Sequence, residues 1–402
     1  MELTPGFKQT EIGPIPEDWD FTALDREISA LEAGISVNST GRRPSGDAKG
    51  ILKTSCVSKG LFLPLEVKEI ASRDIERATT SARGDTVVIS RMNTYDLVGE
   101  SGYVCKDYPS LFLPDRLWMT RMRPGSMLEA RWLVLMLNHA PLRAALRESA
   151  TGTSGSMKNI SKSAVMGLEI PLPSLPEQRA IAEVLGDMDG LLDAYDRQID
   201  KARHVKLAAM QALLSGRTRL PGFSAPWTTT TLGDLLILSY GRSQKVVAVE
   251  GGSVPVFATG GQIGWASEAL HQGPAILIGR KGTIDNPYLV KSPFWATDTT
   301  YWCVEKPNYD IRYISEVLSS IDWASYNESS GLPSLSAATI KSIPLRMPSL
   351  PEQRAIAAML SDMDAEIDAL VALRAKTAAL KTGLMQQLLT GRTRLPGFGP
   401  TA

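Results

Sequence analysis

Residues 174–223 read SLPEQRAIAEVLGDMDGLLDAYDRQIDKARHVKLAAMQALLSGRTRLPGF, and residues 349–398 read SLPEQRAIAAMLSDMDAEIDALVALRAKTAALKTGLMQQLLTGRTRLPGF. The two stretches align without a gap at an offset of 175 residues and are identical at 29 of 50 positions. Each follows a longer and more divergent segment. The chain is therefore a tandem duplication, which indicates one molecule that holds two different recognition surfaces at a fixed spacing.

Each copy of the repeat is predicted to be one helix of about 40 residues, or about 60 Å at 1.5 Å per residue. A serine, a proline and a glutamate open each copy, which is typical of a helix start, and Gly216 and Gly391 close the two helices. Apolar residues recur at heptad spacing, which predicts a coiled-coil seam. The seam positions are Ile181, Leu185, Met188, Leu192, Tyr195, Ile199 and Ala202, and then Ile356, Leu360, Met363, Ile367 and Leu370.

Charge along the repeat predicts how the two helices pair. In the first copy all seven acids lie within 177–200, while residues 201–219 hold five basic residues and no acid. The second copy has its five acids within 352–368 and its later basic residues within 374–394. Antiparallel pairing sets each acidic half beside a basic half. A polarity that only complements the helix macrodipole is the simpler alternative, but that effect fades beyond the terminal turn, so we expect an antiparallel pair.

The composition is that of an ordinary soluble protein of two to four domains, with 402 residues, 43% hydrophobic and 21% charged. The N-terminus lacks the apolar region of a signal peptide, and no apolar run approaches the ~18 residues of a membrane span. The three cysteines are scattered, with no C-x-x-C pair. We therefore expect a cytoplasmic protein without disulfides, bound metal or cofactor.

The net charge is zero, which by itself argues against a nucleic-acid partner, but the charges are unevenly distributed. Residues 41–170 hold 19 basic and 13 acidic residues, an excess that the average hides. Residues 224–345 hold 8 basic and 10 acidic residues. Charge therefore favours phosphate binding in the first variable region and gives no such support in the second.

The two variable regions are themselves distant copies of each other. Residues 84–91 (GDTVVISR) match residues 273–280 (GPAILIGR), and an amphipathic helix is predicted after each, near 128–148 and 310–324. Several short β-branched strands precede these helices. We therefore predict an α+β protein, in which two domains with β-rich cores are joined by two long helices that form an antiparallel coiled coil with pseudo-twofold symmetry.

The doubled SLPEQRAIA helix start and the doubled LLxGRTRLPGF helix end resemble those of the specificity subunit of Type I restriction–modification systems. The second variable region is similar to a target-recognition domain of that family at 255–264 (PVFATGGQIG), 273–284 (GPAILIGRKGTI) and 294–302 (FWATDTTYW). The first is similar at KTSCVSKGLF, GDTVVISRMNT and DRLW. The resemblance implies that each such domain reads one half of a split double-stranded DNA sequence. It also implies that the helices dock two methyltransferase subunits, and that a separate restriction/translocase subunit cuts.

These observations define four expected domains. Residues 1–173 form target-recognition domain 1, 174–223 a central helical spacer region, 224–348 target-recognition domain 2, and 349–402 a C-terminal helical spacer region. The expected function is that of a DNA-binding specificity subunit which reads a bipartite, asymmetric target.

Candidate DNA contacts are polar residues at matched places of the two variable regions. Arg91 and Arg280 end matching apolar strands, and forked guanidinium groups bind both phosphate and guanine. The turn at 259–262 is expected to bring backbone and amide groups to a base edge, and the Gly/Ser-rich segments 151–159 and 327–334 are expected to donate to phosphates. Lys53 and Ser55 are included on the resemblance alone. The full set is Lys53, Ser55, Arg91, Asn93, Ser154, Ser156, Lys158, Asn159, Thr259, Gly260, Gln262, Arg280, Lys281, Thr283, Ser329, Ser330 and Ser334.

The start of each long helix is a candidate partner surface. Three charged or polar residues stay identical in both copies, although the exposed residues further along have diverged. Packing within a coiled coil does not obviously require this identity, so we expect a pair of patches that bind two copies of one partner. The residues are Glu177, Gln178 and Arg179, and Glu352, Gln353 and Arg354.

The sequence offers little for catalysis by the chain itself. Asp285-Asn286-Pro287-Tyr288 is similar to the catalytic tetrapeptide of adenine-N6 methyltransferases, but it lacks the second proline and no glycine-rich cofactor motif is present. The histidines have no metal-ligand spacing. We expect a non-catalytic subunit; the alternatives are a DNA methyltransferase or fused restriction enzyme that acts on its own, and a protein-binding scaffold without a DNA role.

Overall fold

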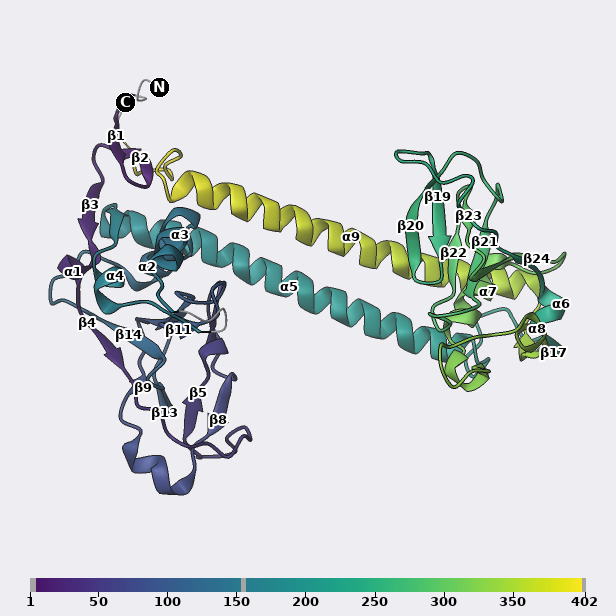
Figure 1. Ribbon diagram of the computed structural model, residues 1–402, viewed down its shortest axis with the longest axis horizontal. Coiled ribbons are helices and arrows are strands. Elements are labelled where there is room, and N and C mark those ends of the chain that lie inside the picture. The colour runs from purple at the N-terminus through teal and green to yellow at the C-terminus, as the bar shows by residue number, and fades with distance from the viewer. Residues whose placement is uncertain (1–4, 153–156, 400–402) are drawn as a thin grey trace. The chain divides into compact units, whose positions relative to one another are not determined.

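The computed structural model describes residues 5–152 and 157–399. The chain divides into two units, of which the first comprises Met1–Asp193 and Ala375–Ala402 and the second comprises Ala194–Arg374. Helices α5 (Leu175–Leu213) and α9 (Leu350–Leu388) are each 39 residues long and contribute a segment to either unit (Figure 1). Each unit is therefore a variable region together with a part of both long helices.

The first unit contains two main sheets and a layer of short helices. Its strands are β1 (Phe7–Thr10), β2 (Gly13–Pro16), β3 (Asp20–Ala23), β4 (Ile28–Ala33), β5 (Gly50–Leu52), β6 (Val57–Ser58), β7 (Gly60–Phe62), β8 (Val67–Glu69), β9 (Ser81–Ala82), β10 (Thr86–Ser90), β11 (Met92–Asn93), β12 (Ser101–Val104), β13 (Tyr108–Phe112), β14 (Leu117–Met122), β15 (Lys158–Asn159) and β16 (Glu169–Leu172). Its short helices are α1 (Leu24–Glu27), η1 (Thr54–Cys56), η2 (Ser72–Arg77), α2 (Ala130–Asn138), α3 (Ala140–Glu148) and α4 (Lys162–Met166). The sheet orders are β4-β14-β10-β12-β7-β6 and β8-β5-β13-β9.

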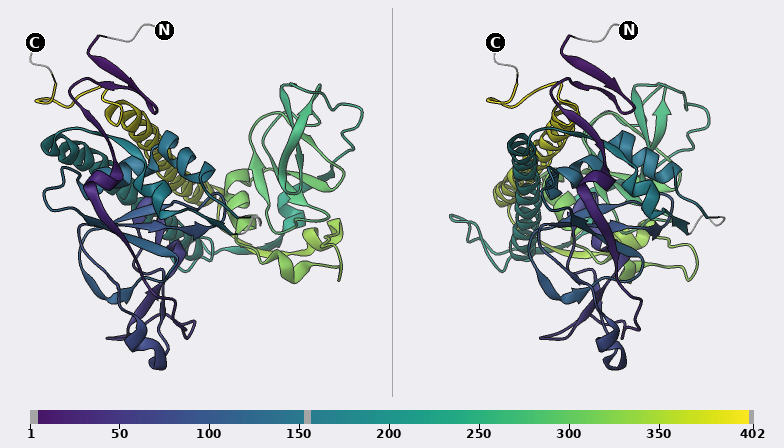
Figure 2. Two further views of the ribbon diagram at one scale, coloured as in Figure 1. Left: turned by 60° about the vertical axis from the view of Figure 1, so that its left-hand side comes forward. Right: turned by 90° about the vertical axis from the view of Figure 1, so that its left-hand side faces the viewer.

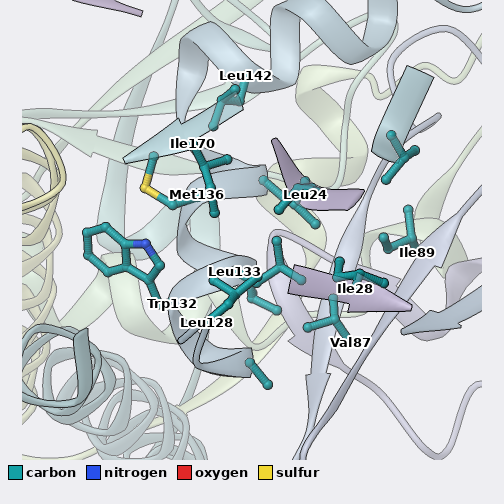
Figure 3. Packing of buried hydrophobic residues seen from close by; sticks show 14 of the residues in the cluster. Leu24, Ile28, Val87, Ile89, Leu128, Trp132, Leu133, Met136, Leu142 and Ile170 are labelled. Carbon is teal, nitrogen blue, oxygen red and sulfur yellow. The ribbon is translucent and has the colours of Figure 1, made fainter. Parts of the chain in front are cut away.

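Strand β10 shows why this unit has layers. Side chains of a strand alternate between the two faces of its sheet, so an apolar run such as Val87-Val88-Ile89 must be covered on both sides. Val87 and Ile89 pack in the cluster that contains Leu133 of α2, whereas Val88 packs in the cluster that includes Leu52 of the second sheet. Figure 3 shows buried side chains of the helix-side cluster, among them Val87 and Leu133, packed closely together.

The second unit repeats this arrangement with fewer strands. Its strands are β17 (Thr228–Thr231), β18 (Leu236–Tyr240), β19 (Val254–Ala258), β20 (Gly261–Ala266), β21 (Ala275–Gly279), β22 (Tyr288–Val290), β23 (Trp295–Ala296), β24 (Thr300–Glu305) and β25 (Pro344–Met347). Its short helices are α6 (Leu232–Leu235), α7 (Ile311–Ser319), η3 (Trp323–Tyr326) and α8 (Ala337–Ser342). The sheet orders are β18-β24-β21-β22 and β20-β19-β23. In β21, Ile276 and Ile278 face the helix-side cluster, and Ala275 and Leu277 face the other cluster.

The two units therefore share a topology despite their divergent sequences. The order β4-β14-β10-β12 in the first corresponds to β18-β24-β21-β22 in the second, and the parallel pair β5·β13 corresponds to β19·β23. The main difference is the connection between the first two strands of the smaller sheet. Strands β5 and β8 are linked by residues 53–66, which contain β6 and β7, whereas β19 and β20 are linked by a tight turn at 259–260. The first unit thus has an insertion that extends its larger sheet.

The two long helices pair antiparallel within each unit. The twelve seam positions expected from the sequence are all buried or half-buried. Lys206 of α5 pairs with Asp364 of α9 in the second unit (Nζ–Oδ1 2.6 Å), and Lys381 of α9 pairs with Asp189 of α5 in the first. Lys381 and Asp364 are the repeat equivalents of Lys206 and Asp189, so the two pairs are related by the duplication. The predicted α+β class with antiparallel long helices is confirmed.

The β1–β2 hairpin and the segment that follows α9 meet in the first unit. Figure 2 shows the β1–β2 hairpin beside the C-terminal end of α9 in both views. Arg394 pairs with Asp18 (Nη1–Oδ1 3.0 Å), and a Cβ atom on Gly391 would lie 2.3 Å from Pro16 Cγ. Gly391 has φ +66° and its counterpart Gly216 has φ +72°, a left-handed conformation that glycine adopts without strain. Both glycines therefore end their helices as predicted.

Candidate nucleic-acid interface

Three segments converge at the end of strand β21 in the second unit. Leu335 N donates to Arg280 O (3.0 Å), Gly282 N donates to Pro333 O (2.8 Å), and Lys281 forms a β-bridge with Ser334. The β19–β20 turn reaches the same place, because a Cβ atom on Gly282 would lie 3.5 Å from Thr259 Oγ1. The structure thus brings together candidates from around residues 259, 280 and 334, which are far apart in the chain.

The polar groups at this convergence are held differently from one another. The Arg280 guanidinium carbon lies 5.5 Å from the centre of the Tyr240 ring, a cation–π contact, and its Nη1 donates to Asp298 O (3.2 Å). The side chains of Lys281, Thr283 and Ser330 are exposed. Asn327 Oδ1 accepts from the backbone nitrogens of Ser329 and Ser334 and thereby folds the 327–334 segment. Gln262 is exposed beside the turn, with Nε2 donating to Gly264 O.

The first unit builds a matching site around Arg91. Arg91 N donates to Arg116 O, and Ile160 N donates to Arg91 O (both 3.0 Å). The equivalent bonds of Arg280 involve Thr299 O and Leu335 N. Strand β11 pairs with β15, so that Asn93 lies opposite Lys158. The matched ends of β10 and β21 expected from the sequence therefore have the same backbone surroundings.

The side chains around Arg91 differ from those around Arg280. The Arg91 guanidinium carbon lies 5.5 Å from the centre of the buried Trp118 ring. Asn93 Oδ1 accepts from Thr94 N (2.9 Å), and Lys158 Nζ donates to Gly152 O (2.7 Å). Arg91 Nε and Asn159 Oδ1 are buried without a hydrogen-bond partner within the part of the chain that the structure describes. The sequence did not identify the aromatic rings beside the two arginines. Trp118 lies on β14 and Tyr240 on β18, which are not equivalent strands of the two units.

The predicted pair Lys53 and Ser55 does not join these sites. Lys53 Nζ and Ser55 Oγ both donate to Glu66 Oε2 (3.3 and 2.7 Å) on the loop that follows β5. These bonds, with Ser55 first, lower the pKa of Glu66, so the charge of Lys53 is paired within the protein. No pairing in the described ranges links either residue to Arg91. Ser154 and Ser156 lie outside the described residues.

The expectation that the helix starts form exposed partner patches is wrong for four of the six residues. Glu177, Gln178, Glu352 and Gln353 are at most 1% exposed. Glu177 is paired with Arg394 and accepts from Trp19 Nε1 (3.2 Å), and Glu352 is paired with Arg219 (Nη2–Oε2 2.6 Å). Internal packing therefore does require their identity, because a buried carboxylate needs its cation. Arg179 and Arg354 are exposed, and their role as partner contacts stays a prediction.

The two buried glutamines attach each variable region to its helix. Gln178 Oε1 accepts from Glu129 N (2.9 Å), the residue that caps α2, and Gln178 Nε2 donates to Pro173 O (2.7 Å). Gln353 makes the equivalent bonds to Asp310 N, which caps α7, and to Pro348 O. The doubled EQ dipeptide is thus a structural joint.

The tetrapeptide at 285–288 is tied to the packing of the second unit. Tyr288 of the Asp285–Tyr288 tetrapeptide donates its hydroxyl to Ala258 O (2.8 Å), and burial raises its pKa to about 12. Over residues 5–152 and 157–399, no three His, Cys, Asp or Glu side chains come together as metal ligands would. Within the same ranges, no helix combines the length and apolar character that crossing a bilayer requires.

Comparison with known proteins gives the same picture. Residues 225–377 match the family described as Type I restriction modification DNA specificity domain. The chain is 23% identical to a putative type I restriction enzyme MjaX specificity subunit from Methanocaldococcus jannaschii, over 97% of each chain. It is also 23% identical to the EcoEI specificity subunit of Escherichia coli, over 51% of this chain and 36% of that one.

Solved structures share the fold. A Type I restriction–modification S subunit from M. genitalium superposes with a TM-score of 0.64 at 16% identity, over 96% of this chain and 98% of that chain. An HsdS subunit from Thermoanaerobacter tengcongensis gives a TM-score of 0.51 at 17% identity, over 94% and 98%. The family match in the second unit, the relative that matches over almost the whole chain and the shared fold together confirm the resemblance of this chain to the specificity subunits of Type I restriction–modification systems.

Proposed function

We propose that this chain is the DNA-binding specificity subunit of a Type I restriction–modification complex, with one DNA-contacting surface in each unit. The observation that carries the proposal is the pair of matched sites at Arg91 and Arg280, which share backbone bonds and differ in side chains. Phosphate contacts position a protein on DNA, and side chains at base edges give specificity. Two sites with the same backbone arrangement and different side chains suit a bipartite target whose two halves differ in sequence.

We assign these roles to the domains expected from the sequence. Residues 1–173 and 224–348 are the proposed target-recognition domains, and 174–223 and 349–402 are the proposed helical spacer regions. The proposed DNA contacts are the described candidates around Arg91 and Arg280. We infer that partner subunits supply the chemistry, since the one tetrapeptide that is similar to a methyltransferase motif contributes Tyr288 to internal packing. Because such a complex acts on cellular DNA, we propose a cytoplasmic location.

A duplicated surface on the long helices supports two copies of a partner. Six exposed residues of α5 recur unchanged and exposed in α9, although 21 of 50 repeat positions differ. At 100° per residue they fall within about 120° of the helix circumference. We propose that this face binds methyltransferase subunits, one for each copy, and that a restriction subunit joins the same complex. The residues are Pro176, Arg179, Asp187, Asp193, Lys201 and Gln211, with Pro351, Arg354, Asp362, Asp368, Lys376 and Gln386.

Mapping methylated adenines tests the function. The chain is produced with a methyltransferase subunit from the same source genome, and the DNA of the host is sequenced for modified adenines. We expect an interrupted motif with two different halves. Exchanging residues 224–348 for those of another specificity subunit should replace one half of the motif and leave the other unchanged. A continuous or palindromic motif would contradict the proposal, and so would modification by the chain alone.

Sedimentation equilibrium of the same complex tests the partner surface. We expect two methyltransferase subunits for each chain. Arg179→Glu should remove one of them and Arg354→Glu the other, because a reversed charge at an interface disfavours docking. Arg203→Glu serves as the matched control, since this exposed position lies about 120° around the helix from Arg179 and is alanine in the second copy. A complex of one to one in the unmodified protein would contradict this part of the proposal.

A further inference from the structure

Each unit exposes one large apolar side chain at the same place beside its arginine. Met157 in the first unit is 50% exposed, and Leu332 in the second is 65% exposed. Met157 lies two positions before Asn159, which pairs with Met92, the residue after Arg91. Leu332 lies two positions before Ser334, which pairs with Lys281, the residue after Arg280. A single exposed apolar residue needs no explanation. Its recurrence at one structural position of two diverged regions does.

The backbone holds these two side chains in place. In the first unit Thr151 and Asn159 exchange both backbone hydrogen bonds at 2.9 Å, just beyond Met157. In the second unit Glu328 N donates to Ser334 O (3.0 Å), just beyond Leu332. Gly282 N also holds Pro333 O. Each apolar residue therefore precedes by two positions a residue whose backbone is held by hydrogen bonds.

The surroundings of Met157 and Leu332 are polar and cationic. Lys158 and Asn93 adjoin Met157, and Lys281 and Ser330 adjoin Leu332. An apolar protein partner would require a continuous apolar patch with a polar rim. A lone apolar side chain among arginine, lysine and hydroxyl groups instead matches a DNA-facing surface, where such residues enter between bases.

We propose that Met157 and Leu332 act as wedges, each of which enters one base step of its half-site and opens the stacking there. Methionine and leucine are among the residues that proteins use for this purpose. The neighbouring cations would hold the flanking phosphates while the step opens. Each half-site then contains one step whose sequence is selected by how easily it deforms, without a hydrogen bond to its bases. This inference rests on the proposed DNA-binding function.

The test uses the complex with methyltransferase subunits and a duplex that carries its mapped motif. A 2-aminopurine base is placed in turn at each step of both half-sites, because its fluorescence rises when stacking is lost. The methyltransferase itself unstacks the adenine that it modifies, so the mapped methylation positions are left out of the comparison. We expect one further bright step in each half-site. Leu332→Ala should abolish the signal in one half only, and Met157→Ala in the other. Each should weaken binding about tenfold, as expected for the loss of most of one buried apolar side chain. Leu332→Met and Met157→Leu should retain both properties.

Salt dependence separates a wedge from a phosphate contact. Leu332→Ala should leave the slope of log affinity against log salt unchanged, whereas the control Lys281→Ala should reduce that slope by about 1. Unchanged fluorescence and affinity in both alanine variants would overturn the wedge while leaving the proposed function intact. Loss of methyltransferase binding in place of DNA binding would also overturn it. Failure of the unmodified complex to prefer its mapped motif would remove the proposed function and the wedge together.

Discussion

Each unit contains an equivalent buried glutamate, Glu177 in the first and Glu352 in the second, and the neighbours of the two differ. In the first, Glu177 is paired with Arg394, accepts from Trp19 Nε1, and shares its arginine with Asp18. In the second, Glu352 is paired with Arg219, but Trp227 Nε1 is buried without a hydrogen-bond partner among the described residues. Both arginines lie over the tryptophan ring, at 5.4 and 5.6 Å. The ion pair has been kept, whereas the groups around it have changed.

This difference shows which parts of a duplicated protein are constrained. A buried ion pair tolerates little change, because loss of one member leaves an uncompensated charge in the interior. Residues that only surround the pair can diverge. The sites around Arg91 and Arg280 show the same pattern of retained and changed interactions. Their backbone hydrogen bonds are shared, while the side chains next to the two arginines differ. Since the duplication, the ion pair and the backbone bonds have stayed the same in both units, and the side chains around them have changed.

Removing the arginine should have the largest effect on this comparison. Arg394→Ala would leave Glu177 buried without its cation and should lower the free energy of unfolding by about 3–5 kcal/mol. Arg219→Ala should change stability in the same direction but less, because Arg219 lacks a second carboxylate partner of the kind that Asp18 provides. Urea denaturation measures both. Arg392→Ala, at an exposed position two residues away, is the control and should cost less than about 0.5 kcal/mol. A larger loss for Arg219→Ala would reverse the comparison.

The glutamine joints should also differ between the units. Gln178→Leu breaks bonds to Glu129 N, Met127 O and Pro173 O, whereas Gln353→Leu breaks bonds to Asp310 N and Pro348 O. Each buried group left unpaired costs about 1–3 kcal/mol, so Gln178→Leu should destabilise the protein more. Thermal unfolding gives the difference. Gln211→Leu at an exposed position of α5 should have little effect, and equal losses at Gln178 and Gln353 would argue against the extra bond to Met127.

The arginine sites should separate the two half-sites. Arg91→Ala should weaken binding to a duplex by about 1–3 kcal/mol if the guanidinium contacts a base. A duplex in which the corresponding half-site is scrambled should show no further loss, while Arg280→Ala should behave in this way only with the other half-site. Fluorescence anisotropy of the complex with each duplex gives the coupling. Equal sensitivity of both variants to both half-sites would mean that the units do not read DNA separately.

The smallest expected effect concerns Glu316 of α7, which lies beside Lys206 in the second unit. Lys206 contacts both Asp364 and Glu316 of α7, and burial raises the pKa of Glu316 above its usual value of 4.5. A raised folded-state pKa means that the contribution of Glu316 to stability is largest below pH 4.5 and falls as the pH rises through the folded value. Glu316→Gln should remove that fall. The variant should therefore be slightly more stable than the unmodified protein at pH 7 and equal to it at pH 4, as measured by urea denaturation. A loss of stability at pH 7 would show that the Lys206 pair outweighs burial.

Much of the architecture could be predicted because its signals are local. Heptad spacing and charge polarity are properties of consecutive residues, so the seam from Ile181 and the antiparallel pairing followed from the repeat alone. The apolar runs that end at Arg91 and Arg280 likewise identified two matching strands. Unit 1 departs from this match at 53–66, where an insertion forms β6 and β7. An insertion of this kind leaves no periodic signal, because strands of two or three residues are too short to show one.

The fate of single polar residues could not be predicted in the same way. Glu177 and Gln178 look like exposed helix residues, yet both are buried. The sequence did not reveal this, because the cation that pairs with Glu177 is Arg394, which lies 217 residues further along the chain. Lys53 and Ser55 were expected to face DNA, and Glu66 binds both. In each case the deciding partner is distant in sequence or lies on another strand, and charge pairing depends on distance in space.

By itself, the sequence determined that this protein is a duplication, that its repeats are long helices of opposite charge polarity, and that each variable region contains an apolar strand ending in arginine. Only the tertiary structure decided that residues near 259, 280 and 334 form one surface. It also decided that Glu177 and Glu352, which are identical in the two repeats, are buried. The physical reason is that helices and strands arise from interactions between near neighbours, whereas burial and ion pairing arise from contacts that exist only once the chain has folded.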